Sequence, residues 1–105
     1  MFLDQRLREE IIHIVSRYTD IESVMLFGSR ARGDADPRSD IDLAVKAPNM
    51  QNATWTQLIE ELEEGLHTLL LIDIVKFENA SRDLRQNIIH EGKVLYEQTK
   101  SEPKH

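Results

Sequence analysis

Residues 27–45 read FGSRARGDADPRSDIDLAV, and this stretch decides the fold and points to the chemistry. Its last third is an apolar run that predicts a strand, with Asp40 at the start and Asp42 within it. Because side chains alternate faces along a strand, both aspartates point to one side while the apolar residues between and after them point to the other. Two anions on one face repel each other and resist desolvation, so the pattern calls for a cation.

The preceding residues add a second feature, a Gly-Ser turn after the apolar run at 23–27. Gly28 lets the backbone approach a phosphate closely, and the Ser29 hydroxyl with nearby N–H groups can bind phosphate oxygens at a helix start. A plain strand-ending turn is the alternative, and for Gly-Ser alone it is the more common one. A carboxylate pair beside such a turn is typical of phosphoryl or nucleotidyl transfer sites.

The acidic residues carry competing interpretations. Asp40 and Asp42 can bind Mg²⁺, which prefers oxygen ligands, or they can end a turn and lie on a solvated strand face. Asp73 lies within a third apolar run, where an ionised carboxylate is costly unless it is paired or metal-bound. It can join the other two at a metal, accept a proton from an attacking hydroxyl, or pair with Lys46 or Lys76.

Two arginines follow the Gly-Ser turn. Arg30 and Arg32 can clamp phosphates through bidentate hydrogen bonds, or form salt bridges with Asp34 or Asp36. We expect one of the two arginines to face a ligand.

Composition narrows the class of protein. The chain has 105 residues, 40% hydrophobic and 30% charged, which predicts one domain over residues 1–97 and a disordered polar tail over 98–105. It has no cysteine, no apolar stretch long enough for a bilayer and no signal-peptide pattern, so we expect a cytoplasmic protein without membrane contact. A net charge of −6 argues against direct binding of nucleic acid, while the local arginines suit a compact anion such as a nucleoside triphosphate.

Outward from the central stretch, hydrophobic periodicity predicts alternating helices and strands. Gly92 predicts the end of the last helix, in the usual C′ position. The order gives an α/β fold, a small sheet with helices on one face and the acidic residues on the other. The predicted helices cover residues 4–18, 54–69 and 81–91, and the predicted strands cover residues 23–27, 41–46, 71–77 and 94–96.

Taken together, Gly28-Ser29, ten intervening residues and Asp40-Ile41-Asp42 closely resemble the signature of the DNA polymerase beta-like nucleotidyltransferase superfamily. The strings GSRARG and SDIDL are similar to its minimal nucleotidyltransferase (MNT) branch. The resemblance runs over residues 8–97 and includes Asp73 where the third acid belongs. It implies a small mixed sheet with helices packed on one side, the nucleotidyltransferase fold.

The resemblance also implies a reaction, the transfer of a nucleoside monophosphate, with ATP favoured, to an acceptor hydroxyl. Asp40, Asp42 and Asp73 would hold two Mg²⁺ ions, while Gly28 and Ser29 would bind the β- and γ-phosphates. Minimal members resemble one half of a pair whose other half is a helical HEPN-type protein. In some pairs that protein is a toxin, which the MNT protein silences by adenylylating a tyrosine.

Two alternatives remain at this stage, and homo-oligomerisation is left open. One is a non-catalytic antitoxin or regulatory subunit that acts by binding its partner, with Met50, Trp55 or Phe2 at the interface. The other is a small-molecule modifier similar to aminoglycoside nucleotidyltransferases. The clustered acids argue against the first, and the short length of chain left to build an acceptor pocket argues against the second.

Overall fold

The computed structural model describes residues 3–33 and 39–98. Within these ranges no helix combines the length and the apolar character needed to cross a membrane. The elements in chain order are α1 (Gln5–Val15), β1 (Ser23–Phe27), α2 (Ser29–Arg32), β2 (Ile41–Lys46), α3 (Asn52–Gly65), β3 (Ile72–Lys76), the 3₁₀ turn η1 (Phe77–Asn79), α4 (Arg82–Glu91) and β4 (Lys93–Glu97).

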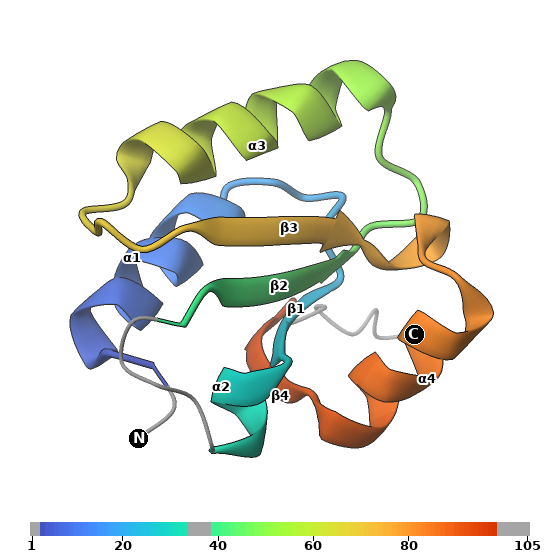
Figure 1. The fold of residues 1–105 in the computed structure, drawn as a ribbon. Coiled ribbons are helices and arrows are strands. Elements are labelled where there is room, and N and C mark those ends of the chain that lie inside the picture. The colour runs from blue at the N-terminus through green and yellow to red at the C-terminus, as the bar shows by residue number, and fades with distance from the viewer. Residues whose placement is uncertain (1–2, 34–38, 99–105) are drawn as a thin grey trace, which may run out of the picture.

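The four strands form one mixed sheet in the order β3-β2-β1-β4. β1 runs antiparallel to both of its neighbours, β2 and β4, whereas β2 and β3 are parallel and are joined through α3. A parallel pair needs such a crossover, because a tight turn can only reverse the chain. The predicted α/β fold with a small mixed sheet is confirmed, and β3 and β4 are its two edges (Figure 1).

The main core lies between the sheet and the helices α1 and α3. Every second residue of β1 and β2 is buried in it, and the helices contribute fully buried aliphatic side chains. Figure 1 shows β2 and β3 in front of α1, with no helix between these two strands and the viewer. The main contributors are Val24, Leu26, Ile41, Leu43 and Val45 from the sheet and Ile11, Val15, Leu58 and Leu62 from the helices.

Helix α4 adds cover on the other side of β1. Met25 alternates with the core residues Val24 and Leu26, so it points away from the main core, and a Cβ at Gly92 would lie 2.6 Å from its Cε. Gly92 ends α4 as predicted, but with φ −69° rather than in the left-handed region. A side chain there would also meet the Ile88 carbonyl oxygen at 2.4 Å, so this glycine is needed for space.

Two predicted helices end earlier than their apolar stripes. The first stops at Val15, and Tyr18 stays buried through a turn in which its N–H donates to the Val15 carbonyl. The helix predicted over residues 54–69 is α3, which stops at Gly65. Leu69, which was predicted to lie on its apolar stripe, is fully exposed. The predicted tail lies outside the described residues except for Gln98, whose N–H donates to the Glu22 carbonyl.

Candidate active site

Gly28 holds the junction between β1 and α2 in a conformation that side chains resist. Its φ of +75° and ψ of −156° belong to a region that is essentially restricted to glycine. A Cβ at this position would lie 2.4 Å from Asp42 Oδ2. The missing side chain therefore makes room for the Asp42 carboxylate directly beside the turn that leads into Ser29.

Asp42 and Asp73 are brought together by the pairing of two strands. Phe27, the residue before Gly28, is the register partner of Asp42 across β1 and β2, and Asp73 is the partner of Asp42 across β2 and β3. Paired residues in adjacent strands project to the same face, about 4.8 Å apart along the hydrogen-bonding direction. The sheet thus aligns both carboxylates on the face opposite the main core.

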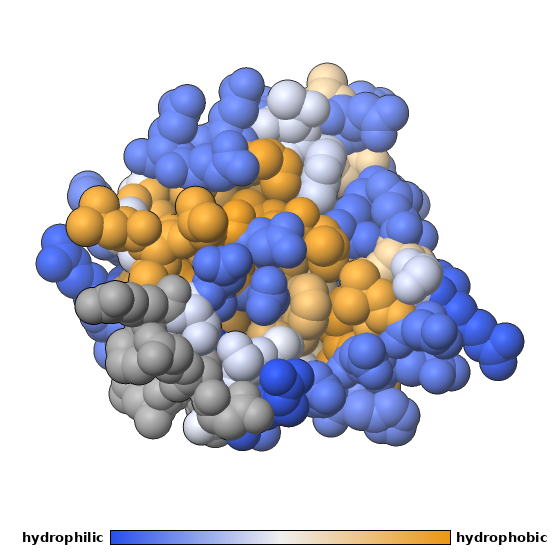
Figure 2. All heavy atoms as spheres, in the orientation of Figure 1, coloured by the Kyte–Doolittle hydropathy of each residue, from blue (hydrophilic) through white to orange (hydrophobic). Residues whose placement is uncertain are grey.

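This face is the one turned to the viewer in Figures 1 and 2. No helix lies in front of β2 and β3 in Figure 1, and Figure 2 shows hydrophilic surface over these strands with hydrophobic surface around it. Asp73 and Asp40 are exposed, and Asp42 is half-buried.

The pKa of Asp42 is affected by the neighbouring acidic residues. Partial burial, together with the negative charges of Asp73 and Asp40, raises the pKa of Asp42, and Arg32 acts in the opposite direction. A carboxylate in these surroundings gains from a nearby cation. Within residues 3–33 and 39–98 no three acidic or histidine side chains already form a group that could hold a metal ion. The three-carboxylate metal site therefore stays a prediction, with the pair Asp42 and Asp73 as its aligned part.

The lysines considered as partners for Asp73 make other contacts. The Lys76 Nζ donates to the Met50 carbonyl at 3.2 Å, and the Lys46 Nζ lies over the Phe77 ring, 5.9 Å from its centroid. In the described part of the chain no ion pair involves Asp73.

The arginines of α2 have structural contacts that the sequence did not reveal. The Arg30 Nε and Nη2 both donate to the Ser39 carbonyl at 3.0 Å, which ties α2 to the residue before Asp40. The Arg32 Nη1 lies 3.1 Å from Glu91 Oε1, which ties α2 to the end of α4. Asp34 and Asp36, the salt-bridge partners considered above, lie outside the described residues.

Ser39 and Glu91 are therefore positioning residues that sequence reasoning missed. Ser39 acts through its backbone carbonyl, which leaves no mark in a sequence. A role of either arginine in binding phosphate stays a prediction.

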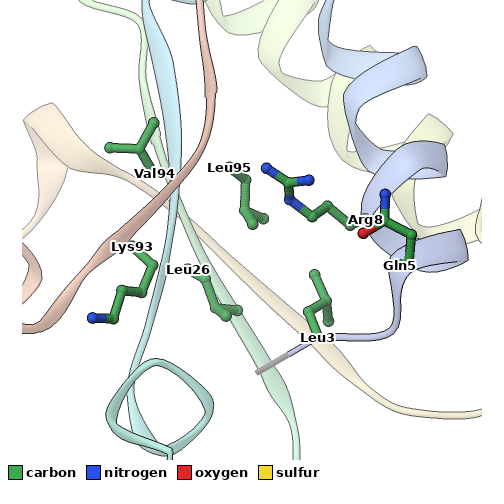
Figure 3. A pocket seen from close by; sticks show the side chains of 7 residues that line it. All are labelled: Leu3, Gln5, Arg8, Leu26, Lys93, Val94 and Leu95. Atoms are coloured by element: carbon green, nitrogen blue, oxygen red, sulfur yellow. The ribbon is translucent and has the colours of Figure 1, made fainter. Parts of the chain in front are cut away.

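A separate cavity of about 320 Å³ lies between the start of α1 and the strands β1 and β4. Leu26 and Leu95 belong to the main core, so the cavity lies on the helix-covered side of the sheet, away from the carboxylates. Figure 3 shows Arg8 and Gln5 projecting from α1 on one side of it and Lys93 on the other. Its lining residues are Leu3, Gln5, Arg8, Leu26, Lys93, Val94 and Leu95.

Comparison with known proteins decides the family. The family model described as "Polymerase beta, Nucleotidyltransferase" matches residues 9–101, nearly the whole chain. The chain belongs to the polymerase beta nucleotidyltransferase family. The resemblance seen in the central motif is thereby confirmed.

This chain is similar to toxin–antitoxin proteins. It is 32% identical over 77 residues to the protein adenylyltransferase MntA of Shewanella oneidensis, a match that covers 72% of this chain. The chain spans about half (54%) of the length of that curated relative.

Two solved structures share the fold of this chain. One is a toxin–antitoxin with AMP-PNP (TM-score 0.70, 29% identity, covering 87% of this chain and 73% of that one). The other is a tri-AMPylated Shewanella oneidensis HEPN toxin in complex with its MNT antitoxin (TM-score 0.68, 27% identity, covering 93% and 74%). The predicted likeness to antitoxin-type minimal nucleotidyltransferases is thus confirmed.

Proposed function

We propose that this chain is a cytoplasmic, Mg²⁺-dependent nucleotidyltransferase that moves AMP from ATP to a hydroxyl of a HEPN-type partner protein. The observation that carries the proposal is the alignment of Asp42 with Asp73 beside the side-chain-free Gly28. The relatives support its finer parts, because one is named a protein adenylyltransferase and another is an MNT antitoxin bound to an AMPylated HEPN toxin.

The residues present fit a divalent cation. The raised pKa of Asp42, with Asp73 in register and Asp40 two residues away, describes oxygen donors whose mutual repulsion a cation would relieve. Asp40, Asp42 and Asp73 would hold the metal, two ions in the full assembly. Bound there, the ions would stabilise negative charge on the attacking and leaving oxygens.

The protein's own groups have separate roles in this reaction. Gly28 allows the triphosphate to approach the backbone, and the Ser29 hydroxyl binds a phosphate oxygen. Asp73 accepts the proton of the acceptor hydroxyl, whose oxygen forms a bond to the α-phosphorus. The bond from that phosphorus to the bridging oxygen breaks, and pyrophosphate leaves.

A non-catalytic binding role is the second candidate, and exposed apolar side chains favour it. The interface residues expected from sequence do not supply them. Met50 is buried, which corrects that expectation, Trp55 packs against the core, and Phe2 lies outside the described residues. Among the residues that the structure describes, the exposed large hydrophobic ones are instead Leu69, Leu71, Ile89 and Val94.

One experiment separates the two candidates. The protein is incubated with Mg²⁺, each of the four nucleoside triphosphates and the unmodified Shewanella oneidensis HEPN toxin, and the toxin is weighed by mass spectrometry. We expect added AMP with ATP, and none with Asp42→Asn. Binding of the toxin without added mass would support the binding role, and equal transfer by Asp42→Asn would refute the proposed site.

A further inference from the structure

Two leucines in the connection that leads into β3 are exposed to an unusual degree. Leu69 is 103% exposed and Leu71 is 72% exposed, in the connection between α3 and β3. Single exposed apolar residues are ordinary, but two within three residues of one short connection offer apolar surface that a partner can bury. We call Leu69 and Leu71 the leucine corner.

The backbone of Leu71 is held beside the site. The Leu71 carbonyl accepts a hydrogen bond from the Ile41 N–H at 2.9 Å, which extends the parallel pairing of β2 and β3 by one residue. Along this extended backbone Leu71 and Asp73 point to the same face, because Ile72 between them packs toward the core. The exposed Leu71 is therefore the next residue along this face of the strand from Asp73.

The order of the strands places the leucine corner on the side of the site from which the acceptor would approach. Gly28 follows β1, Asp42 lies on β2 and Asp73 lies on β3, which is the edge of the sheet. If the triphosphate lies near Gly28, as proposed above, the acceptor must reach the acids from the β3 side. The leucine corner lies on that route.

We propose that the leucine corner seats a basic acceptor protein, by binding an apolar side chain next to the acceptor hydroxyl. This inference rests on the proposed function. The apolar part follows from the corner itself, and Figure 2 shows hydrophobic surface next to the hydrophilic centre of this face. The basic part follows from charge complementarity, because the chain has a net charge of −6.

The test compares Leu71→Glu and Leu69→Glu with a matched control at the opposite edge of the sheet. Val94 on β4 is also apolar and 53% exposed, and Figure 3 shows it across the β4 ribbon from Leu95. The probe is the unmodified Shewanella oneidensis HEPN toxin. Affinity is measured by calorimetry, transfer by mass spectrometry at several toxin concentrations, and AMP-PNP binding serves as the check on the nucleotide site.

We expect each leucine variant to weaken toxin binding and raise the KM for toxin by about tenfold or more, the size of a lost interface contact. Their kcat at saturating toxin and their AMP-PNP affinity should stay within about twofold of the original protein, as should every property of Val94→Glu. Leu71→Ser and Leu69→Ser repeat the test without added charge, and urea unfolding checks that each variant is folded.

The outcomes are distinguishable from those of the proposed function. Binding without transfer in the unsubstituted protein would refute the transferase, while the affinities of the variants would still decide the corner. Equal effects of Leu71→Glu and Val94→Glu would overturn the inference, and so would a failure of the unsubstituted protein to bind the toxin.

Discussion

Replacing Gly28 with alanine perturbs the site at the point where backbone and carboxylate meet. The backbone at φ +75° and ψ −156° costs a residue with a side chain about 1–3 kcal/mol. The new Cβ would lie 2.4 Å from Asp42 Oδ2, so the Asp42 side chain must leave its rotamer at a further cost of about 0.5–1.5 kcal/mol. We expect Gly28→Ala to lower the free energy of unfolding by about 2–4 kcal/mol.

Urea unfolding followed by the fluorescence of the single tryptophan, Trp55, measures this loss. With a slope of about 1.5 kcal/mol per molar urea, the midpoint should fall by about 1–3 M. Gly65→Ala is the matched control, because Gly65 closes α3 and its new Cβ would meet only the end of Ile14, at 3.3 Å. We expect that control to stay within about 1 kcal/mol of the original protein.

A double-mutant cycle separates the two causes. In an Asp42→Ala background the collision with the carboxylate is gone, so Gly28→Ala should cost less by the rotamer part and keep the backbone part. The reasoning would be refuted if Gly28→Ala lowered the unfolding free energy by no more than Gly65→Ala does. It would be refuted in part if the cost were identical with and without the Asp42 carboxylate.

Three further changes test other parts of the structure. Asp42→Asn should raise the unfolding free energy of the metal-free protein at pH 7. Folding raises the pKa of Asp42, so the charged carboxylate destabilises the folded state and its removal is favourable. In urea unfolding at different pH values, this gain in stability should vanish below pH 3.8, where the carboxyl is protonated in both states. Gly92→Ala places a Cβ 2.4 Å from the Ile88 carbonyl oxygen and 2.6 Å from Met25 Cε on β1, and should cost about 1–3 kcal/mol by the same assay. A neutral result would contradict the close packing of the end of α4 on β1. Burial and the hydrogen bond that the Tyr18 hydroxyl donates to Glu61 raise the pKa of Tyr18 to about 12. The contribution of this hydroxyl to the free energy of unfolding is therefore complete below pH 10 and is lost as pH rises through about 12. Tyr18→Phe should flatten that alkaline loss of stability, and parallel curves of unfolding free energy against pH for both proteins would refute this prediction.

Much of the fold could be predicted because hydrophobic periodicity records burial directly. The strands at Ser23–Phe27 and Ile41–Lys46 match their predicted bounds. The helix predicted over residues 54–69 extends past the end of α3, because Leu66 and Leu69 continue its apolar stripe beyond Gly65. Leu66 is buried from an extended conformation and Leu69 is exposed, and periodicity alone cannot separate these cases from a helix.

The candidate site was predictable in its residues and less so in its contacts. The spacing of Asp40 and Asp42 placed both acids on one strand face, but only the parallel pairing of β2 with β3 brings Asp73 opposite Asp42. One of Arg30 and Arg32 is predicted to face a ligand, and the contact of Arg30 with the Ser39 carbonyl was not predictable, because every residue carries such an acceptor and no sequence distinguishes it. The closeness of Gly28 to Asp42 Oδ2 depends on the register of β1 with β2, which the sequence does not specify locally.

The most direct measurement of the central claim is the binding of AMP-PNP by calorimetry, with Mg²⁺ and with a chelator, to the unsubstituted protein, Asp42→Asn and Asp73→Asn. If these two carboxylates share a cation with the triphosphate, Mg²⁺ should strengthen binding by about tenfold or more, equal to about 1.4 kcal/mol, and each substitution should abolish most of that gain. An equal Mg²⁺-dependent gain in all three proteins would show that the nucleotide is held elsewhere and would contradict the account.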